Sequence, residues 1–277
     1  MERAGPVTAE WRAAREIPPL RRWSRGEVFL AGVLLTLAAL GWILTHLMGA
    51  PEMRVGILTG AQPMADMMPA SLLGASLFLG TWIVMMAAMM LPSVVPFTIG
   101  VGRLMRAGGA GRSGTALLTL GYFAVWVATG AIAYVVWRSF EGLSVESPTA
   151  AARAGSAVLF GAAIYQLTPL KRVCLRHCRS PTLLLLHHGP QAVASRFGAT
   201  RAGLAHGLYC LGCCWALMAV LLALGVMSLV WMGVVAAVIA LEKVTRYGEP
   251  ISRGLGVLLA GLAVLVQLDP AVLAMIG

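Results

Sequence analysis

The hydrophobic positions of the chain are gathered into long runs, and the polar positions fall mainly between them. Seven runs approach or exceed the ~20 residues that a helix needs to cross the ~30 Å hydrocarbon core of a bilayer. They lie at about 28–48, 71–91, 115–138, 154–170, 203–223, 226–242 and 254–269. The fifth and sixth are divided near Gly225, because one helix over both would overshoot the bilayer about twofold. The pattern predicts an all-α fold, a polytopic integral membrane bundle of about seven transmembrane helices.

The composition supports this interpretation. The 277 residues are 59% hydrophobic and 12% charged, whereas a soluble domain carries about 25% charged residues. The hydrophobicity excludes an intrinsically disordered chain, and five cysteines in this length exclude a disulfide scaffold. A membrane protein is the remaining class.

The net charge of +10 reflects topology. Of the 21 basic residues, all but Arg54, Arg138 and Arg153 fall in the N-terminal arm or in the second, fourth and sixth connections. Positive loops stay in the cytoplasm, so we expect a cytoplasmic N-terminus in a bacterial inner (cytoplasmic) membrane. The basic residues would then contact the lipid bilayer, and no nucleic acid partner is expected. The predicted organisation is a cytoplasmic arm at 1–27 and one transmembrane domain at 28–277, with a cytoplasmic loop at about 171–202.

The fifth run carries the residues most suggestive of chemistry. His206, Cys210, Cys213 and Cys214 follow one another at i, i+4, i+7 and i+8, which places them on one face of a helix. Thiols and an imidazole together favour a soft transition metal. The alternative is packing, because cysteine also serves as a small hydrophobic residue at helix contacts.

The second run ends in paired methionines. Met85 and Met89, and Met86 and Met90, form two adjacent i, i+4 stripes, and thioethers bind Cu(I) well. Pro92 follows, and with Pro96 it predicts a helix broken at membrane depth, whose freed carbonyls need other partners. Counting 1.5 Å per residue from each end, the methionines and Cys210 could share one depth in the cytoplasmic half of the bilayer. Packing remains the alternative for a methionine stripe.

A third group follows the fourth run. Cys174, His177 and Cys178 lie on one side of a helical turn, and basic neighbours from Lys171 to Arg179 predict lowered thiol pKa values. The same cations would repel an incoming metal ion. Glu242 and Lys243, at the end of the sixth run, are interpreted as a snorkelling pair. We find no P-loop, G-x-S-x-G motif or intramembrane carboxylate pair, so no catalytic residue is predicted.

Three segments together resemble a known family. They are MMAAMMLPS at 85–93, YQLTPLKRVCLRHC at 165–178 and HGLYCLGCCWALM at 206–218, with GYFAVW at 121–126. The chain resembles, over roughly residues 70–270, the DUF2182 family of bacterial integral membrane proteins, which are described as predicted metal-binding. The resemblance implies metal ligands at the matching positions, which are Met85, Met86, Met89, Met90, Cys174, Cys178, His206, Cys210, Cys213 and Cys214.

Three functions are compatible with these features. The first is a protein that binds, transports or delivers a soft metal, with Cu(I) favoured and Zn(II) possible, and that exchanges it with a donor or acceptor protein. The second is a structural or assembly subunit of a larger membrane complex, in which the sulfur groups serve packing alone. The third is a membrane thiol oxidoreductase that uses Cys213 and Cys214, or Cys174 and Cys178, as exchange pairs. Within the first function, we expect His206, Cys210 and Cys214 to form the core of the site, completed by Met86 and Met90.

Overall fold

A computed structural model describes residues 23–48, 71–107, 111–140, 147–180, 195–224, 228–269 and 271. Eight helices make up these ranges, with no strand among the described residues, and the expected all-α fold is confirmed. The helices are α2 (Arg25–Met48), α3 (Leu72–Ala107), α4 (Gly111–Phe140), α6 (Pro148–Leu167), α7 (Pro169–Arg179), α10 (Arg196–Leu224), α11 (Leu229–Val244) and α12 (Gly248–Leu268).

Five of these helices are long and apolar enough to cross a membrane, namely α2, α3, α4, α10 and α12. Their outward faces carry large apolar side chains such as Phe29 and Leu268, which are 73% and 77% exposed. Apolar side chains in such numbers on an outer surface are typical of contact with lipid. The described residues therefore indicate a multi-pass membrane protein. The expected spans at 154–170 and 226–242 correspond to α6 and α11, which do not meet the same criterion of length and hydropathy.

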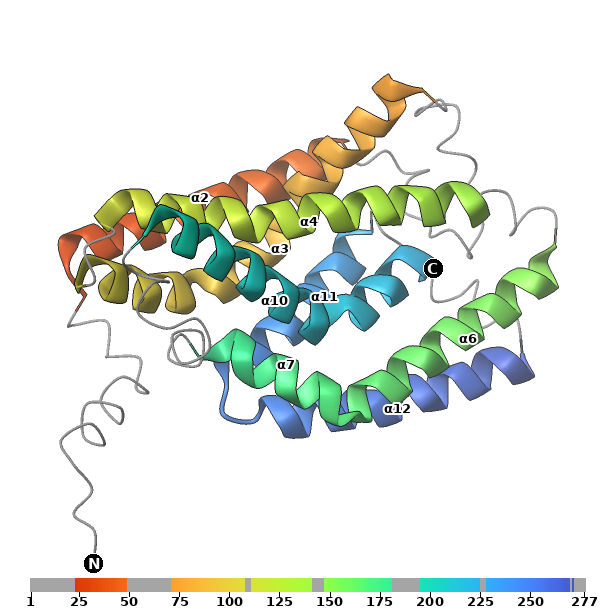
Figure 1. Ribbon diagram of the computed structural model, residues 1–277. Helices are drawn as coiled ribbons and strands as arrows, with labels where there is room; N and C mark the ends of the chain where they lie inside the picture. Colours follow the sequence, from red (N-terminus) through yellow and green to blue (C-terminus); the bar gives the residue numbers. More distant parts are fainter. Residues whose placement is uncertain are drawn as a thin grey trace, which may run out of the picture.

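The helices lie in two groups, and the cysteine-bearing helices α7 and α10 lie between them with α11. Figure 1 shows α2, α3 and α4 along one side of the molecule and the pair α6 and α12 along the other, with α7, α10 and α11 in between. Close approach of α10 to α4 depends on glycine, because a Cβ atom on Gly203 would lie 2.1 Å from the carbonyl oxygen of Leu118. This packing holds the cysteines of α10 in the interior.

Two boundaries differ from the sequence-based expectation. The predicted break at Pro92 and Pro96 is wrong, because α3 continues through both residues to Ala107. Nearby hydroxyls bond to carbonyls along this stretch, from Ser93 Oγ to Met90 O at 2.9 Å and from Thr98 Oγ1 to Val94 O at 3.1 Å. These are not the carbonyls that the prolines leave without an N–H partner, which belong to Ala88 and Pro92, four residues before each proline.

The expected cytoplasmic loop at 171–202 contains helical structure. Thr168 ends α6 and caps α7, accepting a hydrogen bond from Lys171 N at 3.3 Å, and Pro169 occupies the first turn of α7. Both residues are typical of a helix start. Residues 171–179 of this connection lie in α7 and residues 196–202 lie in α10, while its cytoplasmic location stays a prediction. Residues 181–194, residues 1–22 of the expected arm, and residues 225–227, where the turn near Gly225 is expected, lie outside the described residues.

Candidate metal centre

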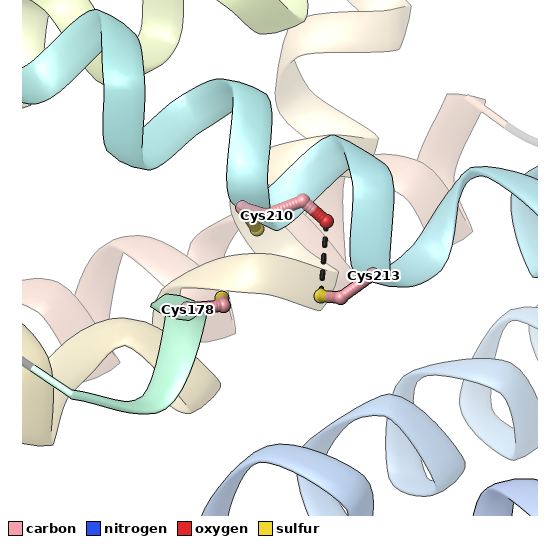
Figure 2. Close-up of side chains that lie close together, drawn as sticks. All are labelled: Cys178, Cys210 and Cys213. Carbon is pink, nitrogen blue, oxygen red and sulfur yellow. Dashed lines mark hydrogen bonds between the residues drawn. The ribbon is translucent and has the colours of Figure 1, made fainter. Parts of the chain in front are cut away.

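Three cysteine thiols from two helices meet in the interior. Cys210 and Cys213 belong to α10 and Cys178 belongs to α7, and their Sγ atoms all lie within 4.8 Å of one another. All three residues are buried, with exposed fractions of 0%, 1% and 4%. Figure 2 shows the three side chains converging on one volume between the helices. Three sulfur atoms at this spacing are a donor set for a soft metal ion.

The way in which α7 lies against α10 explains why the three thiols meet. Cys210 and Cys213 are i and i+3 on α10, so they share a side of that helix. The bend at Thr168 and Pro169 lets α7 lie against α10, where the Tyr165 hydroxyl donates to Gly212 O and the Lys171 ammonium donates to Cys213 O. A Cβ atom on Gly212 would lie 2.7 Å from the Cys174 Sγ atom. Small size at position 212 therefore allows α7 to bring Cys178 to the two cysteines of α10.

Polar groups converge on the sulfur atom of Cys210. The Tyr122 hydroxyl lies 3.2 Å from Cys210 Sγ, and the Lys243 ammonium donates to the same atom at 3.0 Å. The thiols of Cys213 and Cys214 instead donate to the Cys210 carbonyl oxygen, each at 3.0 Å. A hydrogen bond donated by a cation is stronger than one between two neutral groups. Cys210 is thus the sulfur atom whose negative charge this environment would stabilise.

The thiols of α7 behave differently from the sequence-based expectation. Basic neighbours predicted lowered pKa values, but burial raises the pKa of the Cys174 thiol, and Lys171 opposes this only weakly. Hydrogen bonding with Cys210 and Cys213 raises the pKa of the Cys178 thiol well above its usual range. Lys171 has little effect on the Cys174 thiol because its ammonium is directed to the Glu242 carboxylate and the Cys213 carbonyl.

The four methionines line the same core. Met85, Met86, Met89 and Met90 of α3 are each at most 2% exposed and belong to one buried cluster with the cysteines of α10 and Cys178. The Met90 Sδ atom lies 3.6 Å from the Lys243 ammonium, which also contacts Cys210. Met90 is therefore linked to the cysteine group through Lys243.

His206 is buried without a hydrogen-bond partner. It is 1% exposed, and neither ring nitrogen has a partner among the described residues. Its ring stacks on Phe97 of α3, with centroids 3.5 Å apart and planes 5° from parallel. Buried polar atoms nearly always have partners, so two free ring nitrogens fit a residue that receives a ligand.

The gathered set differs from the predicted one. Sequence analysis favoured His206, Cys210 and Cys214, whereas the described thiols that meet are Cys178, Cys210 and Cys213. Cys174, Cys214 and His206 lie outside that group of three. Helical spacing along α10 indicated which face would carry the sulfur atoms, but it contained no information on which face α7 would present.

Sequence analysis also missed the buried charges. Glu242 and Lys243 are 1% and 7% exposed and do not form the predicted snorkelling pair. Glu242 instead pairs with Lys171 at 2.7 Å, and Lys243 contacts Cys210. The signal that could have identified them is their position at the end of an apolar run. An ionisable residue at membrane depth is a candidate for a functional role.

A helical membrane protein with a buried group of cysteines is the class that this fold and site define. Residues 79–266 match the model of a family described as PpoB2, copper chaperone, and the chain belongs to that family. The family name expected from the sequence motifs is not the name of this match, but both descriptions concern metal binding. No curated protein and no solved structure matches the chain.

Proposed function

We propose that this protein is a membrane copper chaperone that holds Cu(I) on Cys178, Cys210 and Cys213 and passes it to an acceptor protein. The observation that carries the proposal is the buried group of three thiols on two separate helices. The family description supports copper as the metal. Cu(I) prefers soft sulfur ligands and tolerates low coordination numbers, so a three-sulfur group suits it.

The arrangement of ligands supports delivery over permanent storage. Two thiols come from α10, which packs against α4, α6 and α11 as well as α7, and the third comes from α7, a helix of 11 residues. Displacement of α7 would remove one ligand and leave two on α10, so an acceptor thiol could enter in place of Cys178. Exchange of this kind transfers the metal without releasing it to water.

Met90 and His206 extend the proposed route. Met90 lies beside Lys243 at the edge of the cysteine group, and His206 precedes Cys210 by one turn of α10. We propose that they bind the ion transiently on its way to or from the cysteines. Met86, Met89 and Met85 would supply further soft surface in the same core.

The proposal also includes how the protein lies in the membrane. We propose seven spans, with α6 and α11 completing the five more apolar helices, a cytoplasmic N-terminus and residence in the bacterial inner membrane. The partition of basic residues supports this orientation. Donor and acceptor proteins are the expected partners besides lipid.

The experiment is a measurement of bound copper in purified protein. We expect one equivalent of Cu(I) in the wild type under reducing conditions, and strong loss in Cys210→Ala and Cys213→Ala with the fold retained. Cys178→Ala should bind copper more weakly and release it faster to a competing chelator. Cys174→Ala is the matched control, because Cys174 lies on the same helix outside the group of three.

The alternatives make different predictions in this experiment. Equal copper in all variants, or none in the wild type, would favour a structural or assembly subunit. A disulfide that forms and breaks between Cys213 and Cys214, or between Cys174 and Cys178, during activity would favour a thiol oxidoreductase. All five cysteines are free thiols in the structure.

A further inference from the structure

Lys243 places a buried positive charge at the edge of the cysteine group. The residue is 7% exposed, and its Nζ atom lies 3.0 Å from Cys210 Sγ, 3.5 Å from Ser93 Oγ and 3.6 Å from Met90 Sδ. Ser93 and Met90 are uncharged. A buried ammonium with only neutral partners is strongly unfavourable.

Among the described residues, no carboxylate forms an ion pair with Lys243, and its neighbour Glu242 is paired with Lys171 at 2.7 Å. Gln166 also donates to Glu242, at 3.3 Å, so both oxygens of that carboxylate are engaged elsewhere. Of the three side chains that contact the ammonium, Cys210 is the one that can carry a negative charge. Any ion bound at the cysteines must therefore share that sulfur with a resident cation.

Building on the proposed copper-binding function, we propose that Lys243 is a specificity-determining residue that favours monovalent over divalent ions at the cysteine group. The repulsion between the ammonium and a bound ion is proportional to the charge of that ion, and it is poorly screened in a buried site. A divalent ion consequently experiences about twice the repulsion of a monovalent one. Cu(I) is monovalent and Zn(II) is divalent.

Selection by charge is needed at this site because thiolate ligands discriminate poorly between Cu(I) and Zn(II). Thiolates are also the preferred ligands of Zn(II), and a site of three cysteines is close to a common structural zinc site. Sulfur therefore excludes hard ions such as Mg(II) but does not exclude zinc. A fixed cation beside Cys210 adds the selection that the donor atoms lack.

The test compares two ions in three proteins. Full-length wild type, Lys243→Leu and Lys243→Arg are purified in detergent under reducing conditions and titrated, in competition with chelators, with Ag(I) and with Zn(II). Ag(I) is the monovalent probe because it is soft and does not change oxidation state. Leucine removes the charge without adding a metal ligand, and arginine retains the charge.

The measured quantity is the ratio of the Zn(II) affinity to the Ag(I) affinity. We expect this ratio to rise at least about tenfold in Lys243→Leu and to stay near the wild-type value in Lys243→Arg. If Lys243 had a purely structural role, its replacement would weaken the binding of both ions alike.

The outcomes separate the two proposals. Binding of both ions with an unchanged ratio in Lys243→Leu overturns the role of Lys243 and leaves the copper site intact. A wild type that binds neither ion overturns the copper site and the selectivity with it. If Lys243→Leu does not fold, Lys243→Gln provides the neutral variant, and the same ratio decides.

Discussion

The Lys171 Nζ atom lies 2.7 Å from the Glu242 Oε2 atom, and each side chain is 1% exposed. The pair joins α7 to α11. The same ammonium donates to the carbonyl oxygen of Cys213, so one lysine connects α7, α10 and α11 directly beside the cysteine group. The position of Cys178, seven residues further along α7, depends on that connection.

We expect Lys171→Met to destabilise the protein strongly. It would leave the Glu242 carboxylate buried without a counter-charge, and breaking a buried pair in this way costs about 3–5 kcal/mol. Thermal unfolding in detergent measures the effect. Copper bound at the cysteines should fall as well, because α7 loses its attachment to Cys213.

Two variants control this prediction. Lys171→Met combined with Glu242→Gln should recover much of the stability, because no unpaired charge remains. Arg176→Met should have little effect, because the Arg176–Glu249 pair is on the surface, with the arginine side chain 65% exposed. Wild-type stability in Lys171→Met would show that the buried pair contributes nothing.

A second prediction concerns the contact between α4 and α10. In Gly203→Ala the new methyl group would lie 2.1 Å from Leu118 O, and backbone cannot move aside as a side chain can. Overpacking of this kind typically costs about 1–3 kcal/mol, and here the two helices themselves must separate. A lower yield of folded protein and a lower unfolding temperature are expected. Gly261→Ala is the control, because no atom lies within 4 Å of its added Cβ.

The hydrophobic pattern predicted the helices well because it is a local property. Each of the seven expected runs corresponds to a helix, and α10 and α11 are separate helices on either side of the expected division near Gly225, which itself lies outside the described residues. Prolines misled the prediction for α3. Whether a helix continues through a proline depends on its packing against other helices, which a single segment does not reveal.

The candidate site was predictable only along α10. The shared face of Cys210 and Cys213 follows from helical spacing, but the arrival of Cys178 depends on how α7 turns at Pro169 and docks beside Gly212. The partners of Lys171 and Lys243 likewise come from helices far away in the sequence. Tertiary contacts of this kind leave no periodic signal.

A third prediction uses alkylation of the thiols. Cys174 is half-buried, whereas Cys178, Cys210, Cys213 and Cys214 are fully buried. We expect a membrane-permeant maleimide to modify Cys174 first in the native protein and the other four only after unfolding, because both access and thiolate are required. Mass spectrometry of peptides from protein treated for increasing times measures the order. Early modification of Cys178 would show that α7 does not keep it enclosed.

The last prediction separates the two possible roles of His206. The ring stacks on Phe97, and Tyr122 lies on its other flank with centroids 5.5 Å apart, so the residue contributes packing whatever else it does. His206→Phe keeps an aromatic ring in the stack and removes both nitrogens, which have no partner among the described residues. Because those nitrogens lie outside the group of three thiols, we expect the copper content at equilibrium to stay at the wild-type level. Transfer of copper to a competing chelator, followed by stopped-flow absorbance, should become slower, because a transient ligand on the route is missing.

An unchanged transfer rate would show that His206 serves packing alone, and a loss of bound copper would show that it is a permanent ligand. His206→Ala, which removes the stack as well, should lower the unfolding temperature in addition, so comparing the two variants separates the nitrogens from the ring.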